Sequence, residues 1–223
     1  FPAMVDPRLT KLADVLTRYS TRIKKGDLVA ITSEPSGEPL VAELARAIVR
    51  LGGHPVWMVR NELIEEILLE HGSDDQLAYL SPLDMHTIET VDVRIGVWAE
   101  SNTKAASRVD PSRSAKLQSA RRPYMKRFMQ RAAEGKLRWC GTQYPTAASA
   151  QDAEMSLRQY EDFVFGAGLL GHPDPVASWQ QIHARQEKIR AYLQTKKLLH
   201  FKVPAKTGIG GNDGTDLRVD VSK

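Results

Sequence analysis

The sequence predicts an α/β fold: a parallel-sheet βαβ domain with flanking helices, followed by a truncated antiparallel β segment of a second domain. The first observation is residues 27–59, where apolar runs at 28–31 and 55–59 enclose a segment, 38–51, with apolar residues at helical spacing. Short apolar runs without polar alternation are typical of strands buried on both faces, and one connecting helix favours a right-handed parallel crossover. The second observation is period-two alternation at 199–203 and 217–221, which indicates half-buried antiparallel strands.

Capping residues and prolines predict the other elements in order. Asp6, Asn61 and Ser81 each precede a helical pattern and are predicted N-caps. Because proline fits the first turn of a helix and breaks its interior, Pro111 and Pro123 divide residues 111–134 into two helices. Apolar runs at 91–98 and 137–140 are the third and fourth predicted strands. Further helices are predicted at 7–23, 62–71, 74–80, 82–90, 157–167 and 175–193.

The apolar runs also predict the core, because a parallel sheet is covered on both faces. Eight side chains are expected to be buried: Leu28, Ala30, Val56, Met58, Ile95, Val97, Leu137 and Trp139. Exposure of most of them would contradict the βαβ interpretation.

The loop after the first strand, residues 32–39, is where nucleotides bind in many α/β folds. It has one glycine and neither GxGxxG nor GxxxxGK[ST], and Glu34 and Glu38 would repel a pyrophosphate. We interpret Ser36 as the N-cap of the next helix and the two acids as complements to its dipole. A nucleotide-binding protein is therefore the weakest functional hypothesis.

The net charge of +4 conceals a basic segment, residues 101–138, which carries +9 and leaves −5 on the rest of the chain. Basic blocks raise nucleic acid as a partner, but these residues spread around the predicted helices and alternate with apolar ones. We expect a solvated helical face or a field that steers anionic ligands, and no nucleic-acid partner.

Two features bear on location. No apolar run approaches the ~18 residues that span a bilayer, and the N-terminus lacks a secretory pattern, so no membrane partner and a cytoplasmic protein are expected. The one cysteine, Cys140, can form no internal disulfide, which agrees with a reducing compartment.

The sequence has no local motif for catalysis. No two of the six histidines lie three or four residues apart, and HExxH, CxxC and GxSxG do not occur. Cys140 has no identifiable base near it and is expected to be an inert core residue. No catalytic, cofactor-binding or metal-ligating residue is therefore assigned to this chain.

Several separated stretches carry a family resemblance by their order and spacing. They are Val109-Asp110-Pro111, Ala120-Arg121-Arg122-Pro123, Arg131 to Gly135, Leu137-Arg138-Trp139 with Gly141-Thr142, Met155-Ser156-Leu157, Tyr160 to Val164, Asp174-Pro175-Val176 with Trp179, and Gly214 to Leu217. With these, the chain resembles the thermophilic metallo-aminopeptidases of the aminopeptidase T and aminopeptidase S type.

The resemblance implies an enzyme that removes N-terminal residues from peptides. In that family a C-terminal domain holds two divalent metal ions, of the zinc or cobalt type, through ligands that belong after the strand Thr215-Asp216-Leu217. None of those ligands can be placed on this chain. We expect residues 1–195 to form an N-terminal α/β domain with trailing helices, and 196–223 to be the first strands of a truncated catalytic domain. Such a fragment is expected to be inactive, its full-length parent acting on peptide substrates.

A stand-alone α/β interaction or dimerisation module without peptidase activity is the alternative. If the two terminal runs pair as a hairpin, six apolar side chains share one face: Leu199, Phe201, Val203, Leu217, Val219 and Val221. That is too much apolar surface to leave in water. We expect the hairpin to fold back onto the helices around Phe163 and Trp179, or to be covered by a second copy in a homodimer.

Overall fold

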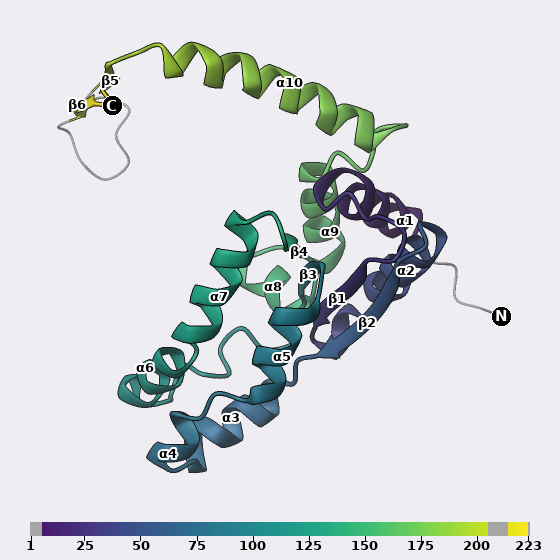
Figure 1. Cartoon of the computed structure of the whole chain (residues 1–223), viewed down its shortest axis with the longest axis vertical. Helices are drawn as coiled ribbons and strands as arrows, with labels where there is room; N and C mark the ends of the chain where they lie inside the picture. Colours follow the sequence, from purple (N-terminus) through teal and green to yellow (C-terminus); the bar gives the residue numbers. More distant parts are fainter. Residues whose placement is uncertain (1–5, 205–213, 223) are drawn as a thin grey trace. The chain divides into compact units, whose positions relative to one another are not determined.

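The computed structural model describes residues 6–204 and 214–222 (Figure 1). The chain divides into two compact units, residues 1–176 and residues 177–223, and each is described by itself. Among the described residues, the first unit contains a four-stranded sheet and the second a two-stranded hairpin.

The sheet of the first unit is parallel throughout, in the order β2-β1-β3-β4. Its strands are β1 (Leu28–Ser33), β2 (His54–Val59), β3 (Val93–Trp98) and β4 (Arg138–Gln143). β1 lies between β2 and β3, so β1 and β3 are the inner strands and β2 and β4 the edges. The predicted α/β class and the parallel βαβ unit are confirmed.

The helices lie close to their predicted positions. They are α1 (Pro7–Asp14), α2 (Glu38–Arg50), α3 (Glu62–His71), α4 (Asp74–Leu77), α5 (Pro82–Thr90), α6 (Pro111–Ala120), α7 (Arg122–Ala133), α8 (Ala147–Asp152), α9 (Leu157–Ala167) and α10 (Pro175–Gln194). The side chains of Asp6, Asn61 and Ser81 each accept a hydrogen bond from the backbone N–H two residues further on, as N-caps do.

Two helical predictions need correction. The first helix is shorter than predicted, because α1 ends at Asp14 and a π-helical segment, Val15–Ser20, follows it. The sequence did not predict α8, whose six residues are too few to show a hydrophobic period. The predicted break before Pro123 is confirmed, since α6 ends at Ala120 and α7 begins at Arg122.

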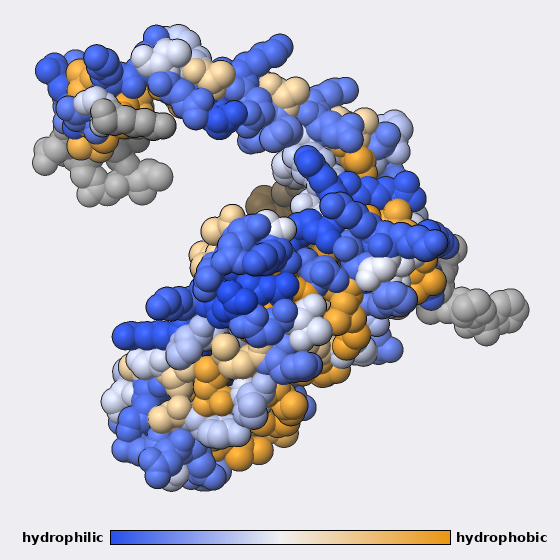
Figure 2. Space-filling model, viewed as in Figure 1, coloured by the Kyte–Doolittle hydropathy of each residue, from blue (hydrophilic) through white to orange (hydrophobic). Residues whose placement is uncertain are grey.

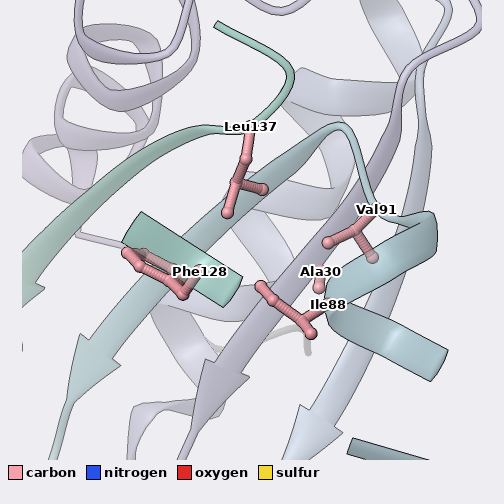
Figure 3. Packing of buried hydrophobic residues seen from close by; sticks show 5 residues of the cluster. All are labelled: Ala30, Ile88, Val91, Phe128 and Leu137. Atoms are coloured by element: carbon pink, nitrogen blue, oxygen red, sulfur yellow. The ribbon is translucent and has the colours of Figure 1, made fainter. Parts of the chain in front are cut away.

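Side chains alternate between the two faces of the sheet. Val29, Ile31 and Ile95 on one face are fully buried, and α2, which packs against α1, contacts β1 and β2. On the other face Ala30 belongs to a cluster with Ile88, Val91, Phe128 and Leu137, drawn in Figure 3. The sheet therefore has a helical layer on each face, as a parallel sheet requires.

The core prediction is right for the inner strands and wrong at the edges. Ala30, Ile95, Val97 and Leu137 are buried, and Leu28 and Met58 are partly buried against the cluster of Figure 3. Two residues were wrongly predicted as core: Val56 on β2 is 47% exposed and Trp139 on β4 is 51% exposed. An edge strand has a sheet neighbour on one side alone, so an apolar run there does not guarantee burial.

The second unit contains β5 (Leu198–Val203) and β6 (Thr215–Asp220), which pair antiparallel. Leu199 lies opposite Val219 and Phe201 lies opposite Leu217, so the predicted hairpin and its shared apolar face are confirmed. Residues 205–213, which connect the strands, are outside the described residues. Contacts of the hairpin with the helices around Phe163 and Trp179 stay a prediction.

Arg131 of α7 joins elements on the Ala30 face of the sheet. Its side chain is buried, and its guanidinium donates to the carbonyl oxygens of Ile88 and, at 2.8 Å, Val91. A further hydrogen bond reaches the carbonyl of Lys136 at 3.3 Å. These carbonyls lie at the end of α5 and in the loops before β3 and β4, so one side chain fixes three chain segments.

We expect Arg131→Leu to lower the free energy of unfolding by about 2–4 kcal/mol, because three backbone carbonyls would lose a charged donor in a buried setting. Urea unfolding followed by circular dichroism measures this. Arg127→Leu on the same helix is the matched control: it breaks an exposed ion pair with Glu89 and should cost much less. Equal losses in the two variants would contradict the role given to Arg131.

Candidate functional site

The strand order places a candidate site at one edge of the sheet. The chain leaves β1 toward β2 on one side and later returns to β3 on the other side of β1. Beyond the carboxyl ends of β1 and β3 the two loops therefore diverge, and open parallel sheets bind their ligands at such a switch point. Here the loops begin with Glu34 after β1 and Ala99 after β3.

Glu34 joins these two loops. Its carboxylate is 4% exposed and accepts the backbone N–H of Ala99 at 3.0 Å, while the other oxygen lies 3.9 Å from Nε of Arg60. From the sequence alone, Glu34 is expected to complement the dipole of α2. The structure instead gives it a tertiary partner, which no local pattern could indicate. A buried carboxylate here also disfavours a bound phosphate.

Ser36 was wrongly predicted as the N-cap of α2. Its hydroxyl donates to the carbonyl of Ala99, and Gly37 is the residue that precedes the helix, without a side-chain cap. A Cβ at Gly37 would lie 2.2 Å from Oγ of Ser33 and 3.1 Å from Cβ of Ala99. The loop after β1 is therefore packed against the loop after β3, and the one glycine serves that close approach.

A cavity of about 770 Å³ lies beside this junction on the Ala30 face of the sheet. Its floor includes Ala30, Thr32 and Arg94 from the inner strands. Its walls come from α3, α5, the start of α7 and loop residues 100–106. Figure 2 shows apolar side chains at the surface over α3 and β2, where Ile64 and Val59, 67% and 54% exposed, line its wall.

Two of the three arginines that line this cavity lie near a carboxylate. Arg121 pairs with Glu65 at 3.1 Å, and Arg60 approaches Glu34 as described above. Arg94 forms no ion pair with any described residue. Further acidic residues in the lining are Glu62, Glu66, Asp84 and Glu100, so the cavity carries a net negative charge around one unpaired arginine.

The sequence did not nominate Thr32, Arg94 or Tyr124, which meet in this cavity. One signal for Arg94 was available, since it is the charged residue within the apolar run of β3. A charge at the centre of a buried strand needs a partner or an opening to solvent. Thr32 and Tyr124 offered no comparable signal.

Comparison with known proteins decides the family. The model of the thermophilic metalloprotease family (M29) matches residues 5–223. The chain belongs to this family.

Two relatives show how much of a family member the chain represents. Aminopeptidase 2 of Geobacillus stearothermophilus is 21% identical over 211 residues, which are 89% of this chain and 51% of that protein. The structure of wild-type AmpT from Thermus thermophilus aligns with a TM-score of 0.76 at 23% identity, over 96% of this chain and 53% of AmpT. This M29 chain thus has the fold of AmpT over about half of AmpT's length. Its sequence likewise matches about half the length of Aminopeptidase 2.

The described part of this M29 chain does not fit a metal centre. Within residues 6–204 and 214–222, no three His, Cys, Asp or Glu side chains are placed to hold a metal ion. Of the histidines, His71 lies 3.7 Å from Glu70 and His200 lies 2.8 Å from Asp216, on opposite units of the chain. We derive no catalytic step through a metal from these residues.

Among the described residues, the structure contains no helix with the length and hydrophobicity that a membrane span requires.

The basic segment 101–138 is tied into the fold more closely than a solvated face would be. Eight of its eleven cations bond to carboxylates or backbone carbonyls: Lys104, Arg113, Lys116, Arg121, Arg127, Arg131, Lys136 and Arg138. Arg138, for example, binds Asp27 at 2.7 Å and the carbonyl of Arg22 at 2.7 Å. Most of this charge therefore has a structural partner, and steering of anionic ligands stays a hypothesis.

Cys140 lies on β4, and burial raises the pKa of its thiol to about 12. At neutral pH the sulfur is therefore a thiol and a poor nucleophile. This agrees with the interpretation of Cys140 as an inert packing residue.

We expect iodoacetamide to leave Cys140 almost unmodified at pH 8 in the folded protein and to alkylate it rapidly in 8 M urea, where the pKa returns to about 8.5. Mass spectrometry of the intact chain measures the modified fraction over time. Rapid alkylation of the folded protein would show an accessible thiolate and contradict the assignment.

Proposed function

We propose that this chain is the non-catalytic N-terminal part of a metallo-aminopeptidase that removes N-terminal residues from peptides. The membership in the M29 family carries the proposal. It is supported by the aminopeptidase name of the Geobacillus relative and by the share of each relative that the chain covers, 51% and 53%. Peptides are then the substrates of the whole enzyme, in the cytoplasm, as the single cysteine suggests.

In this proposal the hydrolytic chemistry comes from two divalent metal ions of the zinc or cobalt type, which activate water and polarise the scissile carbonyl. The described residues offer no ligand set for them. We therefore assign this chain a structural part: its parallel sheet supports the neighbouring catalytic domain, of which β5 and β6 are the first strands. By itself the chain is inactive.

Two proteins test this proposal: the 223-residue chain and the product of the longest reading frame that contains it. With Co²⁺ or Zn²⁺, the longer product should hydrolyse leucyl-p-nitroanilide and lose the activity with EDTA, because metal ligands are complete there. The 223-residue chain should show no turnover.

Metal-dependent turnover by the shorter chain, unchanged after a second chromatographic step, would contradict its inactivity. A reading frame that adds no further chain, or a longer product without activity, would contradict the aminopeptidase proposal. The alternative, a stand-alone interaction module, would then account better for the fold.

We also propose that two copies of this chain associate through the hairpin. Phe201, Val203 and Leu217, which share one face of the hairpin, are 50%, 43% and 51% exposed within one copy, which is unusual for large apolar residues on a short hairpin. A two-stranded hairpin is marginal by itself in water, and pairing with a second copy would cover both its apolar face and its free edges.

Light scattering after size exclusion, on the full chain and on a chain that ends at Thr195, measures this association. The full chain should be a dimer and the shorter one a monomer, because removal of β5 and β6 removes the apolar surface. As a control, Phe201→Ser with Leu217→Ser should also give a monomer. Two monomeric proteins of equal stability would contradict the proposal.

A further inference from the structure

Three polar side chains on the floor and wall of the 770 Å³ cavity have no hydrogen-bond partner among the described residues. They are the guanidinium of Arg94, the hydroxyl of Thr32 and the hydroxyl of Tyr124. Each residue is partly buried, and none of the three polar groups is closed off from solvent. Their N–H and O–H groups converge in one cavity and are available to a ligand, as the few polar groups of a binding pocket are.

Arg94 differs from the other arginines of this region in its contacts. Its guanidinium lies over the rings of Tyr124 and Phe128, 5.9 Å and 5.6 Å from their centroids, and within 4.0 Å of no described carboxylate. Contact with a ring face leaves the N–H groups at the guanidinium edge available. Arg113, Arg131 and Arg138, in contrast, direct their N–H groups to backbone carbonyls.

The pairing of the inner strands brings Arg94 and Thr32 together. Ala30 lies opposite Arg94 and Thr32 lies opposite Gly96, so adjacent rows of the same sheet face supply the two donors. Gly96 has no side chain, whereas a Cβ there would be in van der Waals contact with Oγ1 of Thr32, at 3.7 Å. A ligand can therefore approach the hydroxyl and the guanidinium from the same side.

The rest of the lining selects among anions. Met58, Ile64 and Leu68 give the cavity an apolar wall suited to a hydrocarbon group. Glu62, Glu66 and Glu100 place negative charge around it, which disfavours a doubly charged phosphate and any polyanion. A singly charged carboxylate with an apolar body fits both properties, because a guanidinium binds a carboxylate through two parallel N–H groups.

We propose that this cavity binds the carboxylate of an amino-acid-sized ligand, with Arg94 as the charged donor and the hydroxyls of Thr32 and Tyr124 as further donors. The site lies within the first unit, to which all its lining residues belong. It stands whether or not the chain is part of an aminopeptidase.

Three probes test the ligand class, by ligand-observed NMR titration of the 223-residue chain. N-acetyl-L-leucine has a carboxylate and no ammonium, L-leucinamide has an ammonium and no carboxylate, and inorganic phosphate has charge without an apolar body. N-acetyl-L-leucine should bind saturably at millimolar concentrations or below. L-leucinamide and phosphate should bind at least tenfold more weakly.

Three variants test the residues. Arg94→Gln should weaken binding of N-acetyl-L-leucine at least tenfold, and Thr32→Val, which keeps the shape and removes the hydroxyl, should weaken it several-fold. Arg127→Gln is the matched control, because it removes the same charge from α7 outside the cavity, where the guanidinium pairs with Glu89. Its binding should stay within twofold of the unmodified chain.

Circular dichroism and thermal unfolding establish that each variant is folded. If Arg94→Gln does not fold, Arg94→Lys, which keeps the charge and loses the planar fork, replaces it and should also weaken binding. The proposal is wrong if N-acetyl-L-leucine does not bind, if L-leucinamide or phosphate binds as tightly, or if the folded Arg94 and Thr32 variants keep full affinity. An equal loss in Arg127→Gln would likewise contradict it.

Discussion

The parallel pairing of β1 with both β2 and β3 is the constraint on which the first unit depends. Because β1 is an inner strand, its backbone hydrogen bonds are satisfied on both sides and its side chains are covered by helices on both faces. The same pairing brings the ends of β1 and β3 together. The carboxylate of Glu34 can then accept the N–H of Ala99, and the hydroxyl of Ser36 can reach the carbonyl of the same residue.

Arginine side chains make many of the other hydrogen bonds between distant chain segments. Arg113 binds carbonyls at the end of α3, Arg131 those at the end of α5, and Arg138 those in the turn after the π-helical segment. Each carbonyl lies where a helix has ended and has lost its intrahelical donor, so the guanidinium satisfies groups that would otherwise be orphaned. This gives the basic segment a role in the fold that does not depend on any anionic partner.

The two functional proposals concern different parts of the molecule. Family membership and coverage of about half of each relative connect the chain to aminopeptidases, and the hairpin of β5 and β6 is where the catalytic domain would begin. The cavity beside β1 and β3 belongs to the first unit, and its lining is independent of the hairpin.

The sequence by itself determined the fold class, the starts of several helices and the shared face of the hairpin, because these follow from short-range physics. Asp6, Asn61 and Ser81 cap helices within two residues of themselves, and alternation at 199–203 and 217–221 fixes which side chains share a face. The order of motifs also placed the chain in its family before any contact was known.

The tertiary structure alone decided strand order, edge exposure and the candidate site. Nothing local distinguishes Trp139 on an edge strand from Ile95 on an inner one, and their exposures of 51% and 0% arise from what lies beside each strand. Glu34 and Ala99 are 65 residues apart, and Thr32 and Arg94 meet through strand pairing. Sequence patterns report a residue's own periodicity and caps, whereas burial and ligand contacts depend on partners brought in from distant parts of the chain.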